Sequence, residues 1–350
     1  MAGLVAAARL RQLGRDAVLN EKGPRLGGSM LLSSCVVWRH REWDDFVREC
    51  PDGDQKLQRL IWERLDDALD WLRRLGAPVV WEETGNPATT GKRFEPQGLV
   101  ASLERAAGAI ELGSGELHEG PTILCTGGFA ASPELVSRYI APAATMRLRA
   151  SPWSTGDGLE RGLARGAATS AGMGEFYGRN MPDAPFGEAD FVGASQLYGR
   201  FARIFDENGE EFFAASDVSW SETNVVQATA RRPHTRAYYL LDEQGLAGRV
   251  RDKTVADLVA TAPPEARIAV RNLPFGAPDG TVEAVRVAAA ITHTIGGLAV
   301  DEQARVLRAD GSAIDGLWAA GVDVGGVATG GYASGLAQAL VLGLVAAENV

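Results

Sequence analysis

The stretch GLVAAARLRQLGRDAVLNEK (3–22) decides the fold predicted for this chain. Gly3 opens an Ala- and Leu-rich helical pattern that runs to Gly14, and residues 16–22 then form a strand-like segment in which Glu21 stands near the end. A helix and a strand in this order, with an acid at the strand end, make the second half of a dinucleotide-binding strand–helix–strand unit. In its motif G-x-G-x-x-G, Gly3 takes the place of the third glycine.

The bulk composition favours a globular protein with a small-molecule ligand. A chain of 350 residues, 45% of them apolar, is long enough for one or two domains. Its 42 glycines exceed the usual share of about 7% and indicate tight turns and backbone that lies close to a ligand. The formal net charge of −10 argues against a nucleic-acid partner, because such binding depends on clustered Lys and Arg.

The cysteines and the apolar segments bear on the cellular setting. Cys35, Cys50 and Cys125 are odd in number and lack the spacing of metal ligands, so we expect no metal site. The sequence shows no signal peptide and no long apolar span. We therefore expect a cytoplasmic protein in a reducing setting, with no membrane partner.

The pattern along the chain predicts an α/β fold with one domain inserted into another. Residues 54–75 have helical apolar spacing and predict one amphipathic helix, while TILCTGGFA (122–130) predicts a buried strand entering a glycine turn. The middle of the chain mixes aromatic strand-like segments with polar helical ones, and glycine-rich motifs occur again after it. We expect a discontinuous first domain, 1–187 with 290–350, and an α+β capping domain, 188–289.

Six segments resemble the fumarate reductase/succinate dehydrogenase flavoprotein family, which includes the 3-ketosteroid dehydrogenases. They occur in the family's order, from near residue 3 to residue 345, and the likeness thins in the middle domain. The resemblance implies a Rossmann-like FAD-binding domain with an inserted capping domain. The segments are EKGPRLGGSM (21–30), ILCTGGF (123–129), TGDGL (155–159), THTIGGL (292–298), DGSAIDGLWAAGVDVGG (310–326) and GGYASGLAQALVLG (330–343).

The resemblance also implies FAD as the cofactor and a set of residues that hold it. Glu21 would accept hydrogen bonds from the adenosine ribose, and the turn at Gly27 and Gly28 would let backbone N–H groups approach the pyrophosphate. The helix that starts near Ser334 would stabilise negative charge on the reduced flavin. Because residues 26–35 contain no histidine, we expect non-covalent binding. The full implied set is Gly3, Glu21, Lys22, Gly27, Gly28, Ser29, Thr126, Gly127, Gly128, Asp157, Gly321, Asp323, Ser334, Gly335 and Leu336.

One cofactor position departs from the family pattern. Val322 stands where many members have a Glu that binds the flavin ribityl chain, and Asp323 follows one place later. We expect Asp323 to provide a weakened form of this contact.

The family chemistry is hydride transfer between flavin N5 and a carbon beside an activating carbonyl or carboxylate, with a protein acid or base moving the matching proton. His293 resembles the histidine that hydrogen-bonds the activating group. Tyr332 stands where fumarate reductases carry an Arg that clamps a carboxylate, and a phenol cannot make that bidentate pair. We therefore expect a ketone-activated small-molecule substrate, together with an electron donor or acceptor.

The middle domain supports this departure from the fumarate reductases. In GEEFFAASDVS (209–219), Glu211 replaces the Arg of their motif, and Ala214 and Ala215 replace its Asn–Glu pair. Three residues are candidates for the proton-transfer group, Tyr198, Tyr238 and Arg249, and nothing in the sequence separates them. Arg249 lies closest to the position of the family's acid Arg and completes the predicted catalytic set.

The start of the chain raises a second expectation. The first two glycines of the nucleotide motif, and the strand that carries them, would fall before Met1. Either the start is misplaced, which the intact helix and Glu21 favour, or this is a degenerate member with weak flavin affinity. A flavin-free binding protein or pseudoenzyme of the same fold is therefore the alternative function. A nicotinamide-only dehydrogenase fits less well, because the later glycine motifs match a flavin site.

Overall fold

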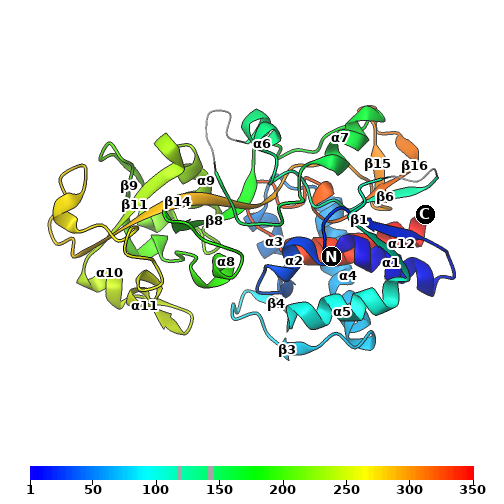
Figure 1. Ribbon diagram of the computed structural model, residues 1–350, viewed down its shortest axis with the longest axis horizontal. Coiled ribbons are helices and arrows are strands. Elements are labelled where there is room, and N and C mark those ends of the chain that lie inside the picture. The colour runs from blue at the N-terminus through cyan, green and yellow to red at the C-terminus, as the bar shows by residue number, and fades with distance from the viewer. Residues whose placement is uncertain (117–119, 141–145) are drawn as a thin grey trace. The chain divides into compact units, whose positions relative to one another are not determined.

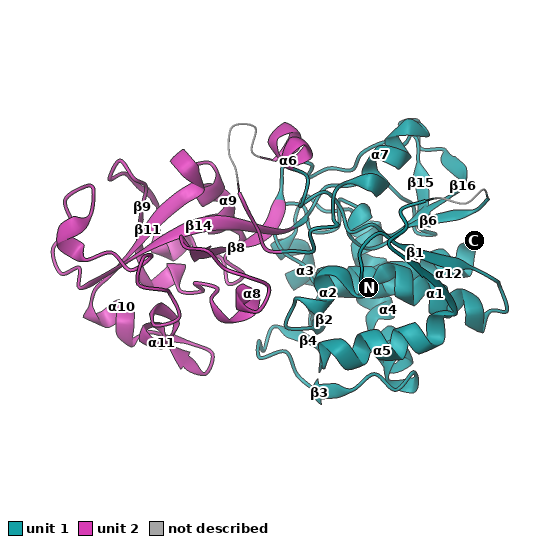
Figure 2. Ribbon diagram, in the orientation of Figure 1, with its two compact units in different colours: residues 1–132, 150–175, 293–350 teal, residues 133–149, 176–292 magenta. Residues whose placement is uncertain are grey.

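The computed structural model describes residues 1–116, 120–140 and 146–350. The chain divides into two compact units, which Figure 2 colours separately: unit 1 comprises 1–132, 150–175 and 293–350, and unit 2 comprises 133–149 and 176–292. Three segments predicted to belong to the first domain lie instead in unit 2, namely residues 133–149, 176–187 and 290–292. The physical reason is strand pairing, because β7 (Arg147–Leu148) and β8 (Phe176–Pro182) both pair with β14 (Glu283–Thr294).

The described residues of unit 1 form three small sheets, together with several helices (Figure 1). The predicted strand after the first helix is β1 (Val18–Glu21), which pairs in parallel with β5 (Ala109–Leu112). The predicted buried strand is β6 (Thr122–Leu124), at the edge of a sheet of order β15-β16-β6. The remaining strands of unit 1 are β2 (Val36–His40), β3 (Val79–Trp81), β4 (Thr89–Phe94), β15 (Arg305–Leu307) and β16 (Ala313–Ala319).

Two helices from opposite ends of the chain form the centre of unit 1. These are α1 (Ala2–Gln12) and α12 (Gly335–Asn349), and most residues of both are buried. Ala6 and Leu10 of α1 pack against Ala347 of α12, as expected of helices that are apolar on nearly every side. The predicted amphipathic helix is confirmed as α4 (Gln55–Arg74), which Asp54 caps by accepting from the N–H groups of Lys56 and Leu57. The other helices of unit 1 are α2 (Gly28–Leu31), α3 (Trp43–Glu49), α5 (Pro96–Ala107) and α7 (Asp157–Ala164).

Unit 2 is built on a mixed sheet of order β10-β9-β11-β14-β7, with β8 also on β14. Alternate residues of β11 (Arg236–Leu241) and β14 point to opposite faces. One face, with Tyr239 and Val287, packs on Tyr198 and Val225 in the larger core. The other elements of unit 2 include α6 (Pro133–Tyr139), α8 (Asp190–Gly193), β9 (Arg203–Phe205), β10 (Glu211–Phe213), α9 (Thr223–Ala230), α10 (Glu243–Ala247), β12 (Arg249–Val250), β13 (Lys253–Thr254) and α11 (Val255–Val259). Within the described part of the chain, no helix combines the length and apolarity needed to cross a bilayer.

Candidate functional site

The end of β1 and the start of α7 meet in unit 1 through an ion pair. The Lys22 ammonium donates to Thr155 Oγ1 at 2.8 Å and to Asp157 Oδ2 at 2.9 Å. Burial alone would raise the pKa of Asp157, but the hydrogen bonds from Lys22 and Thr155 outweigh it and hold the pKa below its usual value. Two residues predicted to face the cofactor are thus paired with each other.

Glu21, at the end of β1, has one fixed carboxylate oxygen and one that is open. Its Oε1 accepts from the Gly23 N–H at 2.8 Å. No described residue forms a hydrogen bond or an ion pair with Oε2, and the side chain is half-buried. The fixed oxygen orients the carboxylate, which leaves the other oxygen able to accept from a ligand hydroxyl.

Gly3 sits where the third glycine of the nucleotide motif is needed. A Cβ added at Gly3 would lie 3.0 Å from Leu19 Cδ1 of β1 and 3.4 Å from the Cβ of Cys125, beside β6. The missing side chain therefore lets the start of α1 approach both strands closely, which is the packing role of that glycine.

The turn before α2 forms a cradle of bare backbone. Gly27 (φ +102°) and Gly28 (φ +50°) both adopt the left-handed conformation that other residues avoid. A Cβ at Gly27 would clash with Val100 at 2.8 Å, whereas one at Gly28 would point into open space. Ser29 Oγ accepts from the Ser151 N–H at 3.0 Å, which anchors the turn to a second segment. A phosphate could approach the backbone on the open side of Gly28.

Asp323 ties together three of the glycine motifs. Its carboxylate accepts from the N–H and the hydroxyl of Thr126 and, at 3.1 Å, from the Gly128 N–H. Thr126 Oγ1 in turn accepts from the Gly158 N–H at 3.0 Å, at the start of α7. Burial raises the pKa of Asp323, and the hydrogen bonds from the turn act against that rise. In this structure the carboxylate holds the Thr126–Gly128 turn, and the direct cofactor contact expected from the sequence stays a prediction.

An unpaired hydroxyl lies beside the same turn. Thr294 Oγ1 is buried and has no hydrogen-bond partner among the described residues. A Cβ at Gly128 would lie 2.6 Å from this oxygen and 2.7 Å from Val322 Cγ1. Buried polar atoms are normally satisfied, so this hydroxyl is a candidate hydrogen-bond partner for a ligand. Thr294 was not among the residues predicted from the sequence, although it lies inside the THTIGGL segment.

The start of α12 brings the flavin-facing residues of the prediction together. Ser334 caps the helix by accepting from the Ala337 N–H at 3.2 Å, and the first N–H groups of a helix have no partner within it. Gln338 donates to the carbonyl oxygens of Gly321, at 2.8 Å, and Val324, at 2.7 Å, which fixes Gly321 beside the helix. A Cβ at Gly335 would lie 3.1 Å from His293 Nε2.

The neighbours of His293 favour one tautomer of its neutral ring. Its Nδ1 lies 3.1 Å from the carbonyl oxygen of Thr294, and a carbonyl only accepts, so Nδ1 carries the proton. Burial lowers the pKa of His293, so the ring is neutral at pH 7. In that tautomer Nε2, the nitrogen that faces Gly335, has the lone pair.

Of the predicted catalytic residues, Tyr332 lies with His293 in unit 1, and Arg249 does not. The Tyr332 ring packs against Trp38 with centroids 5.5 Å apart. Arg249 lies on β12 of unit 2, is exposed, and donates to the Asp252 carbonyl at 3.1 Å. The alternative Tyr198 is fully buried, and its hydroxyl donates to Gln196 Oε1 at 2.7 Å.

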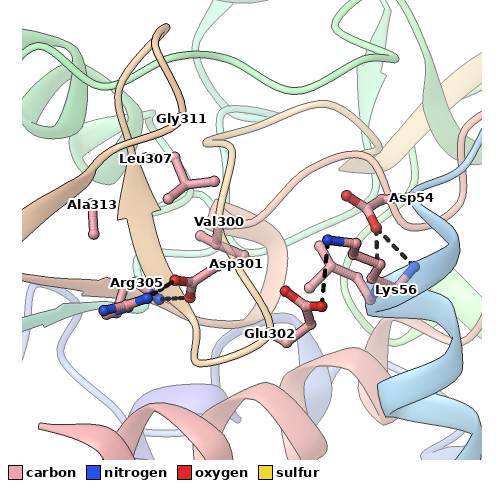
Figure 3. Close-up of a pocket in the computed structure, with 10 residues that line it drawn as sticks. Asp54, Lys56, Val300, Asp301, Glu302, Arg305, Leu307, Gly311 and Ala313 are labelled. Carbon is pink, nitrogen blue, oxygen red and sulfur yellow. Dashed lines mark hydrogen bonds and ion pairs between the residues drawn. The ribbon is translucent and has the colours of Figure 1, made fainter.

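A separate pocket of ≈ 250 Å³ opens in unit 1 between α4 and the β15–β16 hairpin. Figure 3 shows that its charges pair with one another, Asp301 with Arg305 and Lys56 with Glu302. Asp54, also in its lining, is used as the cap of α4. None of the predicted site residues lines this pocket.

A family model described as "FAD binding domain" matches residues 1–105 and 115–336. The chain belongs to this FAD binding domain family. FAD is therefore its cofactor, and the chain is an FAD-dependent oxidoreductase, as the sequence predicted. The residues described above fit the group: Glu21 offers an open oxygen to the ribose, the Gly27–Gly28 cradle suits the pyrophosphate, and the start of α12 suits the flavin.

Similar proteins confirm the predicted family and fold class. The probable fumarate reductase Ifc3 of Shewanella frigidimarina is 23% identical over 99% of this chain and 73% of its own length. The open conformation of a flavocytochrome c3 fumarate reductase has a TM-score of 0.72 at 20% identity, covering 99% of this chain and 76% of its own. The 3-ketosteroid-delta4-(5alpha)-dehydrogenase of Rhodococcus jostii RHA1 has a TM-score of 0.69 at 16% identity. The match covers 99% of this chain and 94% of the dehydrogenase chain. The chain spans about half the length of two further fumarate-reducing relatives.

Replacing Glu21 with glutamine should weaken FAD binding without affecting the fold. Glutamine keeps an oxygen for the Gly23 N–H but removes the charge and the open carboxylate oxygen, which should cost about 1–3 kcal/mol of FAD affinity. Titration of FAD into the flavin-free protein measures the loss, with the exposed Glu104→Gln as a control of equal charge change. A flavin-free variant that unfolds much earlier than the wild type would show that Glu21 serves the fold instead.

Proposed function

We propose that this chain transfers hydride between FAD and a carbon–carbon bond next to a ketone, as a dehydrogenase or an ene-reductase. The observation that carries the proposal is His293, a buried histidine with a lowered pKa that lies beside Gly335 at the start of α12. Tyr332, three residues before Gly335, puts a phenol where fumarate reductases have an Arg. Bound FAD supplies the two-electron hydride acceptor or donor. The ketosteroid dehydrogenase among the structural neighbours, described in complex with 4-androstene-3,17-dione, supports the choice of a ketone.

The chain's own residues would divide the remaining work between them. The Tyr332 hydroxyl would donate to the keto oxygen, where charge builds up as the adjacent carbon loses or gains a proton. His293 would take up or return that proton at Nε2, because Nδ1 is already donating to Thr294. This differs from the sequence-based expectation, in which His293 donated to the activating group. The first N–H groups of α12, which have no partner within the helix, would stabilise negative charge.

A dicarboxylate substrate is the second candidate, because the curated relatives include fumarate reductases. The residues of unit 2 count against it. Glu211, where the fumarate reductase motif has an Arg, is paired with Arg203 at 2.6 Å and cannot bind a carboxylate.

The three cysteines are free, which supports the reducing, cytoplasmic setting expected from the sequence.

Stopped-flow reduction of the bound flavin by a panel of cyclic ketones and dicarboxylates tests the proposal. We expect at least one saturated cyclic ketone to reduce the flavin, or its unsaturated form to reoxidise the reduced protein, faster than succinate or fumarate does. A protein that purifies without FAD and does not bind added FAD would instead support the flavin-free alternative. Faster turnover with the dicarboxylates would reject the ketone assignment.

The pH dependence of flavin reduction should reveal the lowered pKa of His293. A base works in its neutral form, and burial lowers the pKa, so the ring stays neutral below the ordinary value of about 6.5. As the pH is lowered past this value, we expect the rate of flavin reduction to stay constant. The rate should fall only at lower pH, where the ring takes up a proton. The profile of flavin reduction rate against pH measures this limb. His293→Ala should lower the rate and remove the limb, whereas an unchanged limb in that variant would assign it to another group.

A further inference from the structure

Three arginines of unit 2 converge on one buried carboxylate. Asp183, just after β8, has a side chain that is only 1% exposed. Its Oδ2 lies 2.7 Å from the Nε atoms of both Arg236 and Arg286, and its Oδ1 contacts Arg147 Nη2. The arginine side chains are 29–38% exposed, so their outer ends reach solvent while the carboxylate between them does not.

The strand register places all three arginines on one face of the sheet. Arg236 of β11 stands opposite Ala288 of β14, and Arg147 of β7 stands opposite Ala290. Arg286 is two and four residues before these alanines on the same strand, and side chains two apart in a strand share a face. The arginine cluster, Arg147, Arg236 and Arg286, is therefore gathered around the small side chains of Ala288 and Ala290.

The charges of this cluster do not balance. Three guanidinium groups face one carboxylate, which leaves a local excess of two positive charges in a chain whose net charge is −10. Like charges held this close repel one another, and one carboxylate needs no third cation for its own hydrogen bonds. No other acid among the described residues pairs with these arginines, so the excess charge is not neutralised within the cluster.

Donors remain available at the outer ends of the side chains. Arg147 uses both Nη atoms, one on Asp183 and the other on the Ala184 carbonyl at 2.6 Å. Arg236 and Arg286 approach Asp183 through Nε, and their Nη atoms contact no acceptor within the described parts of the chain. Asp183 thus fixes the inner edges of two guanidinium forks and leaves their outer donors free. Such donors suit the paired oxygens of a carboxylate or a phosphate.

We propose that the arginine cluster is an anion-binding site of unit 2 that takes the carboxylate or phosphate group of a small molecule. Asp183 acts as the positioning residue, since it orients the guanidinium groups without facing the ligand. The site goes beyond the hydride transfer proposed above and does not depend on it. Binding alone can therefore test it.

Calorimetric titration of the full FAD-loaded protein with inorganic phosphate and with succinate tests the site. We expect saturable binding of at least one anion, weakened at least about tenfold in Arg236→Ala and progressively weakened by added salt. Phosphate binding without succinate binding would identify a phosphate ligand, and the reverse would identify a carboxylate ligand. Both results support the site.

Two further variants keep the test decisive. Arg267→Ala is the matched control, because Arg267 is paired at 3.0 Å with Glu283, the first residue of β14, and it should bind the anion like the wild type. Arg286→Lys retains the charge but loses the fork, so it should fold and still bind more weakly. The proposal is overturned if neither anion binds saturably, or if Arg236→Ala and Arg286→Lys both bind as tightly as the wild type.

Discussion

Replacing Asp323 with alanine is expected to destabilise the flavin-free protein by about 3 kcal/mol or more. Alanine removes both oxygens that accept from Thr126 and Gly128, and each buried donor left without an acceptor costs about 1–3 kcal/mol. Asp323→Asn keeps one oxygen and should fall between alanine and the wild type. Urea unfolding of the flavin-free protein measures the loss, and the flavin content after purification should fall in the same order.

The control for this series is Asp315→Asn, an exposed carboxylate of the same unit whose loss should change the free energy of unfolding by less than about 0.5 kcal/mol. The series also separates two roles for Asp323. If the carboxylate holds the turn, the flavin-free protein itself is weakened. A flavin-free Asp323→Ala protein as stable as the wild type, with FAD affinity alone reduced, would establish the direct cofactor contact predicted from the sequence.

Tyr332→Phe is expected to slow flavin reduction by substrate roughly a hundredfold or more, while FAD content and folding stay intact. Phenylalanine keeps the ring that packs on Trp38 and removes only the hydroxyl. Losing one donor to a developing oxyanion in a dry site raises the barrier by about 2.7–4 kcal/mol. Stopped-flow reduction with the best ketone of the panel measures the effect.

Two comparisons define what the Tyr332 result means. Tyr238→Phe removes the same group from another candidate and should leave the rate unchanged, since the Tyr238 ring packs edge-on against Phe275 in unit 2. Combining Tyr332→Phe with His293→Ala should cost less than the sum of the two single losses, because groups acting on one substrate are not additive. Normal reduction of Tyr332→Phe together with better turnover of dicarboxylates would reject the keto-oxygen assignment.

Much of the local structure could be predicted from the sequence. Local apolar spacing and nearby glycines were enough to predict three elements. These are the helix that contains Gly3, the strand that ends at Glu21 and the long amphipathic helix. The glycine turns could also be predicted, because the left-handed backbone conformation found at Gly27 and Gly28 favours glycine over other residues. These features depend on neighbours in the chain, which a sequence pattern records directly.

The partners of polar side chains could not be predicted in the same way. Asp323 lies 197 positions from Thr126, and residue type alone did not show that its carboxylate would turn toward that motif. The tautomer of His293 depends on a backbone carbonyl that has no sequence signature. The motifs therefore identify these residues, but they do not predict the hydrogen bonds that decide the residues' roles.

The family, the FAD cofactor and the order of the glycine motifs could be predicted from the sequence, because each depends on short segments in which the backbone needs a glycine or an acid at a fixed position. The folded structure was needed to show that residues 133–149 and 176–187 belong to unit 2 and that three arginines from separate strands meet at Asp183. Both depend on pairing with β14, which brings together segments more than a hundred residues apart. Contacts between such distant segments arise from tertiary packing, and this packing leaves no repeating residue pattern in the sequence from which the contacts could be predicted.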